Sequence, residues 1–368
     1  MTIAIIGSRG YPYVYSGYET FVKELAERLV QKGIHVKVYC HKNLFQTYPK
    51  EVNGIELVYL PTIETKILSQ LIHSFLSMMH ACLGKTDMIL AVNAANGPWG
   101  LIARIFGKPT CINVDGMEWL RPKWKGFGST YFYFSAWLAT KLYDRIITDA
   151  EEMRKVYLEE FKKESTVIAY GANIRYSQNR SLLAQFGLES QEYYLIVGRL
   201  IPDNNADLLI EGFLEANSSK KLVIVGDVPY KDRYAQLLKT KAASNIIFLG
   251  YVTNSEILAE LYHHCFVYLH GHEFGGTNPT MLKAMAYGCA ILALNTRFNK
   301  EMLSDGRFGL FFEKNNQSLA TVMQQIEQQD GLIVNLRSHS RNGLTAKYNW
   351  DHITDAYIVL INELTAGK

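Results

Sequence analysis

The sequence lacks the features that mark disulfide-rich, zinc-binding, secreted and membrane-spanning proteins. Its 368 residues contain five scattered cysteines and no CxxC pair: Cys40, Cys82, Cys111, Cys265 and Cys289. Single thiols argue against a disulfide framework or a cysteine-bound zinc site. The N-terminal stretch MTIAIIGSRG lacks the basic and apolar blocks of a signal peptide. No apolar run approaches the roughly 20 residues that span a bilayer. We therefore expect a cytoplasmic protein.

The chain also lacks a strong net charge. A formal charge of +3 is too small to indicate a nucleic-acid partner. The segment EWLRPKWKGFGSTYFYFSAWLATKLY nevertheless mixes Arg121, Lys123 and Lys125 with Trp119, Trp124 and a dense aromatic run. Such a mixture suits a membrane interface, where aromatic rings sit at headgroup level and cations meet anionic lipid. A buried helix with a basic rim is the alternative.

The N-terminal loop lacks the signature of nicotinamide-dinucleotide binding. In GSRGYPYVYSGYETF, Gly7, Gly10 and Gly17 have the wrong spacing for GxGxxG. The second expected strand ends in VYCHKN, so His41 and Lys42 stand where an acidic residue would bind the ribose. A long loop with Gly17 at its end instead suits a phosphate that is approached from across a cleft.

What the sequence does contain is an alternation of short apolar runs and helical patterns. The first series of expected strands is TIAIIG, HVKVYC, MILAVN, PTCINV, RIITDA and TVIAYG. The second is YYLIVGRL, KLVIVGD, IIFLGY, CFVYLHG, CAILALN and GLFF. Runs rich in Ile and Val that alternate with helices are typical of parallel sheets covered on both faces. We predict an α/β protein with two Rossmann-like, doubly wound domains.

The polar, turn-rich stretch YGANIRYSQNRS separates the two series and predicts an interdomain linker. We expect an N-terminal domain at 1–173, a C-terminal domain at 174–348 and a last helix at 349–368 that returns to the N-terminal domain. Ligands of open α/β sheets bind at the carboxyl ends of the strands. The two domains are therefore expected to face a ligand cleft.

One loop opens directly into a short helix in HEFGGTNPTMLKAMAYG. Asn278 can cap this helix, Pro279 suits its first turn, and Gly288 can end it. Gly275 and Gly276 allow backbone N–H groups to approach a ligand closely. A helix N-terminus with such a loop is suited to bind phosphate. An ordinary, well-capped turn is the alternative.

Two further strand ends carry candidate site residues. In VGRLIPDN, Arg199 follows a buried strand, and a guanidinium offers paired donors to a diphosphate. In NVDGMEWLRPKW, Asp115 follows the strand CINV, with Glu118 close behind. A carboxylate in that position could bind hydroxyl groups or act as a base. The alternatives are a surface arginine and a helix cap.

Taken together, these loops resemble the family 4 glycosyltransferases of the GT-B fold. The resemblance rests on GSRGYPYVYSGYETFVKELA, DGMEWLRPKW, GRLIPDNNADLLIEGF and GGTNPTMLKAMAYG and covers nearly the whole chain. Within that family these motifs are similar to bacterial rhamnosyltransferases that build capsule, cell-wall or lipopolysaccharide chains.

The resemblance implies a nucleotide diphosphate sugar donor, dTDP- or UDP-linked, in the C-terminal domain. The implied donor-binding residues are Gly17, Arg199, Asn204, Glu273, Gly275, Gly276, Thr277, Asn278 and Lys283. The implied acceptor-binding residues are Asp115, Glu118, Trp119 and Arg121. Arg199 would stabilise the leaving diphosphate, while Asp115 would orient the acceptor and, as a second choice, act as a base. Retention without metal or cofactor is implied, which agrees with the absence of a DxD triplet.

The sequence departs from the family pattern at two positions. The family carries two glutamates eight residues apart, and Gly275 and Lys283 occupy those positions here. A lysine cannot accept hydrogen bonds from ribose hydroxyls, so it would donate instead, or the role would pass to Glu273 or Glu301. The family also commonly has a lysine near the position of Asn204.

These observations leave three functional hypotheses. The first is transfer of a sugar, rhamnose by resemblance, to a lipid-linked or oligosaccharide acceptor at the inner face of the cytoplasmic membrane. The second is a non-catalytic scaffold or partner subunit with an impaired donor site, which the departures at Lys283 and Asn204 motivate. The third is a nucleotide-sugar epimerase, which the acceptor-like loop at Asp115 disfavours.

Overall fold

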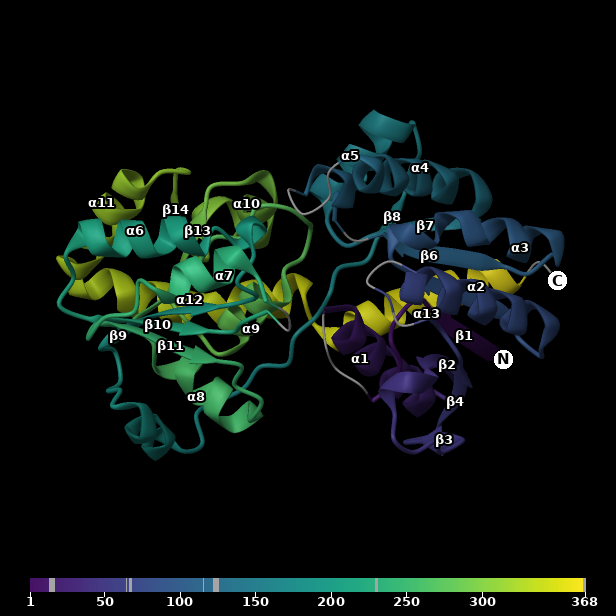
Figure 1. Ribbon diagram of the computed structural model, residues 1–368, viewed down its shortest axis with the longest axis horizontal. Helices are drawn as coiled ribbons and strands as arrows, with labels where there is room; N and C mark the ends of the chain where they lie inside the picture. The colour runs from purple at the N-terminus through teal and green to yellow at the C-terminus, as the bar shows by residue number, and fades with distance from the viewer. Residues whose placement is uncertain are drawn as a thin grey trace. The chain divides into compact units, whose positions relative to one another are not determined.

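The computed structural model describes residues 1–12, 17–63, 65, 68–114, 116–121, 126–228 and 231–366 (Figure 1). The chain divides into two compact units. Unit 1 consists of Met1–Tyr170 together with Trp350–Lys368, and unit 2 consists of Gly171–Asn349. Each unit is built on a mainly or wholly parallel sheet. The prediction of two doubly wound α/β domains is therefore confirmed.

Unit 1 contains an eight-stranded sheet among its described residues, in the order β3-β4-β2-β1-β5-β6-β7-β8. The strands are β1 (Thr2–Ile6), β2 (His35–His41), β3 (Glu51–Val52), β4 (Ile55–Leu60), β5 (Met88–Val92), β6 (Thr110–Val114), β7 (Arg145–Thr148) and β8 (Thr166–Val167). Only the short β3 pairs antiparallel, with β4. The chain reverses its direction across the sheet between β1 and β5, so the loops after these strands meet at a topological switch point.

Helices cover both faces of this sheet. They are α1 (Gly17–Gln31), α2 (Leu68–Leu83), α3 (Gly100–Ile105), α4 (Phe127–Leu142), α5 (Glu151–Phe161) and α13 (Trp350–Thr365), with the 3-10 turns η1 (Lys42–Leu44), η2 (Ala94–Trp99) and η3 (Glu118–Leu120). Every side chain of β5 and β6 is buried, as expected for strands covered on both faces.

Helix α13 packs against α1 and β5. The ring of Phe21 in α1 lies 6.3 Å from that of Trp350 and 5.6 Å from that of Tyr357. The Asn113 amide in β6 donates a hydrogen bond of 2.9 Å to the Tyr357 hydroxyl. These contacts make α13 part of the core of unit 1.

Unit 2 contains a six-stranded parallel sheet in the order β11-β10-β9-β12-β13-β14. The strands are β9 (Tyr193–Val197), β10 (Lys221–Val225), β11 (Ile246–Gly250), β12 (Val267–His270), β13 (Ile291–Leu294) and β14 (Leu310–Phe312). The helices are α6 (Ala206–Ala216), α7 (Arg233–Lys239), α8 (Ser255–His264), α9 (Pro279–Ala286), α10 (Arg297–Met302), α11 (Asn316–Glu327) and α12 (Asp330–Lys347), with η4 (Arg180–Phe186), η5 (Pro202–Asn204) and η6 (Ser304–Gly306).

Helix α6 packs closely against α11 because Gly212 leaves room for Leu319. A Cβ on Gly212 would lie 2.5 Å from a methyl carbon of Leu319. The two helices share a buried cluster with the sheet that includes Leu209, Leu222 and Phe312. In the part of the chain that the structure describes, no helix combines the length and the apolar character needed to cross a bilayer.

Candidate functional site

The candidate site of unit 2 lies where the loops after β9 and β12 meet. These strands are neighbours, and the chain reverses its direction across the sheet between them. The two loops are joined by hydrogen bonds: the Asn205 amide donates to the Gly271 carbonyl at 2.8 Å, and the Glu273 N–H donates to the Asp203 carbonyl at 3.2 Å. The sequence motifs around Arg199 and Gly275 are thus brought to one edge of one sheet.

Arg199 and Asn204 play different parts in this edge. The side chain of Arg199 is exposed, which leaves its guanidinium accessible to an anion. The Asn204 amide instead donates to the Arg199 carbonyl at 2.7 Å, and its Oδ1 lies 2.8 Å from Nδ1 of His272. Asn204, which we predicted as a donor-binding residue, therefore fixes the two loops to each other.

Helix α9 begins at this edge. The Asn278 Oδ1 accepts hydrogen bonds from the N–H groups of Thr280, at 2.9 Å, and Met281, at 3.4 Å. Gly275, in the preceding loop, has a φ of +116°, which a residue with a Cβ rarely adopts. Thr277 is buried. The loop is thus held in one shape ahead of a capped helix N-terminus.

The charged residues near α9 are engaged in ion pairs. A carboxylate oxygen of Glu273 lies 2.6 Å from the Lys314 ammonium nitrogen. A carboxylate oxygen of Glu301 lies 2.5 Å from the Lys347 ammonium nitrogen. Lys283 is half-buried in the second turn of α9. Glu273 and Glu301 were the two residues to which the role of the missing glutamate could pass. Each would first have to exchange its lysine partner for a ligand.

His270 and His272 are residues of this edge that the sequence reasoning missed. His270 ends β12, is buried, and its Nδ1 lies 3.1 Å from the Tyr268 hydroxyl. Its Nε2 has no hydrogen-bond partner among the described residues. Burial lowers the pKa of His270 to about 3, so the ring is neutral at physiological pH. Their place at and just after the end of a buried strand, in HGHEFGG, was the available signal.

In unit 1, the loops after β1 and β5 meet in the same way. Gly7 has a φ of +94°, and a Cβ there would lie 2.3 Å from the Val92 carbonyl oxygen. Gln70 donates to the Gly7 carbonyl at 2.7 Å. Glu19, buried in the first turn of α1, accepts from the Arg9 N–H at 3.1 Å. Gly17, the predicted phosphate-approach residue, is the first residue of α1 and is half-buried.

A pair of buried histidines lies beside this loop and was also missed. The rings of His41, at the end of β2, and His73, in α2, have centroids 3.8 Å apart. Burial lowers the pKa of His41 to about 3 and that of His73 to about 4. Both imidazoles are therefore neutral. The two rings thus pack against each other at this edge of the sheet, with an interplanar angle of 31°, without adding charge.

The predicted acceptor loop is only partly described. Asp115, Lys123, Trp124 and Lys125 lie outside the described residues, so their placement stays a prediction. Glu118 and Arg121 form an ion pair of 2.9 Å between a carboxylate oxygen and Nε.

Trp119 packs into an aromatic cluster in unit 1. Its ring lies 5.9 Å from that of Tyr133 and 5.7 Å from that of Phe161. Trp119 is only 8% exposed and Arg121 only 7%. Of the two alternatives for this segment, burial therefore holds for these two side chains, and their predicted acceptor-binding role stays a prediction.

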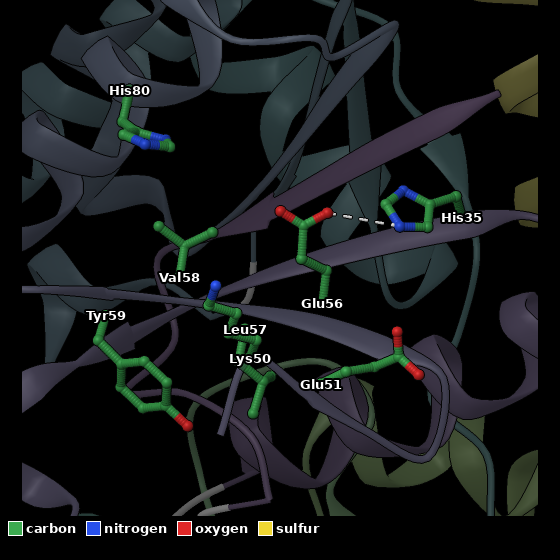
Figure 2. Close-up of a pocket in the computed structure, with 8 residues that line it drawn as sticks. All are labelled: His35, Lys50, Glu51, Glu56, Leu57, Val58, Tyr59 and His80. Carbon is green, nitrogen blue, oxygen red and sulfur yellow. Dashed lines mark ion pairs between the residues drawn. The ribbon is translucent and has the colours of Figure 1, made fainter. Parts of the chain in front are cut away.

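A separate hollow of about 520 Å³ lies beside β4 (Figure 2). Its lining includes Lys50, Glu51, Tyr59 and His80, and none of the predicted site residues. Glu56, one of the lining residues, has a carboxylate oxygen 3.4 Å from the His35 ring nitrogen (Figure 2). Its other carboxylate oxygen lies 3.1 Å from the Lys37 ammonium. Because no predicted site residue lines this hollow, it is not the candidate site. In the described ranges, no group of three or more His, Cys, Asp or Glu could hold a metal ion.

Two family models match the chain, one for each half. Residues 15–175 match Glycosyltransferase Family 4, and residues 180–343 match Glycosyl transferases group 1. The chain belongs to the glycosyltransferases. The prediction of a family 4 glycosyltransferase, made from the loop motifs, is confirmed at this level.

Curated relatives match this glycosyltransferase over part of their length. Alpha-monoglucosyldiacylglycerol synthase of Acholeplasma laidlawii is 27% identical over 167 residues, which is 42% of each chain. Poly(ribitol-phosphate) alpha-N-acetylglucosaminyltransferase of Staphylococcus aureus is 23% identical over 172 residues, 45% of this chain and 34% of the relative. The match thus spans less than half the length of these curated relatives.

Solved glycosyltransferase structures share the whole fold. Sucrose-phosphate synthase of Thermosynechococcus elongatus superposes with a TM-score of 0.84 at 18% identity and covers 100% of both chains. HepE of Anabaena in complex with UDP gives 0.78 at 16% identity, covering 98% of this chain and 99% of that one. The lipopolysaccharide glycosyltransferase WaaG gives 0.70 at 15%, covering 99% and 100%. The glycosyltransferase has the GT-B fold.

Proposed function

We propose that the chain is a retaining, metal-independent glycosyltransferase that moves a sugar, rhamnose as the first candidate, from a nucleotide diphosphate sugar to an acceptor. The acceptor is a lipid-linked saccharide or oligosaccharide of bacterial surface polysaccharide synthesis. The pair of loops in unit 2 carries the proposal. One loop presents the exposed Arg199, and the other leads into the N-terminus of α9. A guanidinium and a helix N-terminus favour the same ligand, an oxyanion such as a diphosphate.

The relatives support each partner of the reaction. HepE was solved with UDP and with UDP-glucose, which supports a pyrimidine nucleotide sugar as donor, UDP- or dTDP-linked. An enzyme of Campylobacter jejuni, 27% identical over 130 residues and 34% of each chain, is named for a diphospho-undecaprenol acceptor. That name supports a lipid-linked acceptor. Rhamnose rests on the resemblance of the loop sequences.

The proposed mechanism uses fixed charges of the chain. Arg199 and the N-terminus of α9 stabilise the negative charge that develops on the departing diphosphate, which lowers the barrier to leaving. Gly275, Gly276, Thr277 and Asn278 lie against the phosphates and the sugar in this proposal, because the two glycines let the backbone approach the ligand closely. Asp115 orients the acceptor hydroxyl, whose proton passes to the leaving phosphate.

The first test is calorimetric titration of the whole chain with dTDP, UDP and GDP in the presence of EDTA. Binding of one of them identifies the donor base and shows a site that needs no divalent metal. Arg199→Ala should weaken that binding by about 10- to 100-fold, as expected for a lost charge-assisted hydrogen bond. Arg180→Ala is the matched control, because Arg180 is an exposed arginine of η4 outside the two loops. Equal affinities for the two variants would contradict the role of Arg199.

The second test is transfer of labelled sugar from dTDP-rhamnose and UDP-sugars to isolated bacterial membranes. Product whose anomeric configuration matches that of the donor supports retention, and product of inverted configuration refutes it. Nucleotide binding without transfer from any donor would refute the enzymatic proposal.

A non-catalytic scaffold is the second candidate. The ion pairs that engage Glu273 and Glu301, together with Lys283 in α9, favour it, because the two glutamates that could take over the ribose contact are each paired with a lysine. It predicts no measurable binding of the three nucleotides and no turnover in a Lys283→Glu variant. Nucleotide binding that improves in Lys283→Glu would instead show a working donor site with altered affinity.

A further inference from the structure

Three neighbouring helices of unit 1 expose large apolar side chains. Helix α2 packs against α3, and α3 packs against α4 (Figure 1). The exposed large apolar side chains on them include Phe75 and Leu83 of α2, Leu101 and Ile105 of α3, and Phe134 and Trp137 of α4. Ile105 is 74% exposed and Leu83 is 71% exposed. We call this surface the α2–α4 face.

The α2–α4 face has an unusual charge pattern. Helices α2, α3 and α4 contain no Asp or Glu, and their only Lys or Arg residues are Arg104 and Lys141, which are both exposed. The helices α1, α5 and α13 of the same unit are rich in acidic residues. The α2–α4 face is therefore apolar and aromatic, and the Asp, Glu, Lys and Arg residues of its three helices are limited to two cations, Arg104 and Lys141.

Two acidic residues next to the α2–α4 face, Asp87 and Asp144, accept hydrogen bonds from backbone N–H groups. Asp87 accepts from the Thr2 N–H at 2.7 Å, and Asp144 accepts from the Thr110 N–H at 2.8 Å. Both carboxylates are thus held by backbone at the amino edge of the sheet. The exposed cations at this edge are Lys85 and Arg145, while the half-buried Lys108 donates to the Thr86 carbonyl at 2.8 Å.

This combination distinguishes among the surfaces that could cover the face. A nucleic acid would meet large apolar side chains that offer nothing to a phosphate backbone. A symmetric second copy would set Arg104 and Lys141 near their own counterparts, with no carboxylate on the three helices to pair with them. An anionic bilayer satisfies both properties, because rings enter the headgroup layer while cations meet lipid phosphates.

We propose that the α2–α4 face is the surface by which unit 1 lies on a bilayer that contains anionic lipid. Phe134 and Trp137, whose rings stack with centroids 5.5 Å apart, enter the interface, and Arg104 and Lys141 pair with the headgroups. The surface keeps α4 of the segment expected from the sequence, but Trp119 and Arg121 are buried and α2 and α3 are added. The inference rests on the proposed function for its purpose, since a lipid-linked acceptor is reached at a bilayer.

The test is flotation of the whole chain with vesicles of phosphatidylcholine alone and of phosphatidylcholine mixed with phosphatidylglycerol. We expect flotation with the mixed vesicles that decreases as salt is raised. Ile105→Ser/Trp137→Ser should lower binding about tenfold or more, since both side chains lose apolar area from the interface. Lys141→Glu should lower it about fivefold or more and only on the mixed vesicles.

The matched control is Tyr48→Ser/Leu237→Ser, which removes two exposed side chains, 48% and 61% exposed, outside the α2–α4 face. It should float like the unmodified chain. Absence of flotation with either vesicle, or equal loss in both double variants, would overturn the proposal. A dimer in solution that Ile105→Ser/Trp137→Ser dissociates would assign the face to a second copy and also overturn it.

Nucleotide titration of the same variants separates this inference from the proposed function. We expect Ile105→Ser/Trp137→Ser to bind nucleotide as the unmodified chain does, because the face is distinct from the loops of unit 2. Flotation of a chain that binds no nucleotide would support the lipid surface and refute the donor site. Loss of nucleotide binding in Ile105→Ser/Trp137→Ser would show that these substitutions disturb the fold. The flotation of Lys141→Glu with the mixed vesicles then tests the lipid surface: unchanged flotation would overturn it.

Discussion

The buried pair His41 and His73 should make unit 1 sensitive to mild acid. Both side chains are almost inaccessible to water, and burial lowers their pKa values from the ordinary 6.5 to about 3 and about 4. The nearby charge of Arg9 acts on His41 in the same direction. The folded unit therefore takes up fewer protons than the unfolded chain as the pH falls. Its stability is full above pH 6.5 and is lost progressively as the pH falls from 6.5 toward 4.

The size of the loss follows from the pKa difference. A pH of about 5 lies about 1.5 units below the ordinary pKa of an imidazole in the unfolded chain. Each unit of that difference corresponds to about 1.4 kcal/mol of unfolding free energy. Each buried histidine should therefore cost about 2 kcal/mol at that pH, and the pair about 4 kcal/mol. That is a large part of the roughly 5–15 kcal/mol by which a domain is stable.

The tryptophans provide a probe for this loss. All five lie in the sequence ranges of unit 1: Trp99, Trp119, Trp124, Trp137 and Trp350. Urea unfolding followed by tryptophan fluorescence therefore reports unit 1, even though unit 2 unfolds in the same tube. The unfolding free energy should be flat from about pH 8 to about pH 7 and fall steeply below 6.5.

The matched variant is His41→Gln/His73→Gln, which keeps polar side chains of similar size but removes the titration. Its unfolding free energy should lose most of the pH dependence between about pH 7 and about pH 5, whatever its stability at neutral pH. A wild-type unfolding free energy that stays constant over this range, or a variant that keeps the full wild-type slope, would refute the assignment of buried neutral imidazoles.

Three further predictions concern single contacts. Gly7→Ala should lower the tryptophan-monitored unfolding free energy by about 1–3 kcal/mol, because its Cβ would lie 2.3 Å from the Val92 carbonyl oxygen; an unchanged value would contradict the close approach. Asn278→Ala should cost about 1 kcal/mol in the circular-dichroism transition of unit 2, since it removes the cap of α9, with Asn278→Asp as the control that keeps it. Glu260→Ala should speed proteolysis within residues 177–179, because the Glu260 carboxylate accepts hydrogen bonds from the N–H groups of Gln178, at 2.7 Å, and Asn179, at 2.9 Å. Equal cleavage rates for the variant and the unmodified chain would refute that anchoring.

Much of the fold could be predicted because its strands are apolar on both sides. Runs such as MILAVN and CAILALN indicate buried parallel strands by composition alone, and their alternation with helices indicates the doubly wound class. Strand β4 was not predicted. Its sequence, IELVYL, alternates buried and partly buried residues near the edge of the sheet, which is a weaker signal than a continuous apolar run.

The candidate site was predictable where local sequence determines the contact. Asn278 caps α9 because capping depends on residues two and three positions away, which the motif contains. The contact between the rings of His41 and His73 joins residues 32 positions apart, so it depends on how α2 packs against the sheet. The role of Asn204 likewise depends on His272, from another strand end. The burial of Trp119 and Arg121 could not be decided from the sequence, because composition does not say which side of a helix or loop is covered.

The return of the chain to unit 1 has a consequence for synthesis on the ribosome. Residues 171–349, a continuous stretch, are made before Trp350 appears, so unit 2 is complete while unit 1 still lacks α13. Until then the Phe21 side of α1 has neither Trp350 nor Tyr357 to cover it, and the Asn113 amide in β6 has no Tyr357 hydroxyl to receive its hydrogen bond. The half that is translated first is the half that can finish folding last, and its uncovered apolar surface is what a chaperone would meet on the nascent chain.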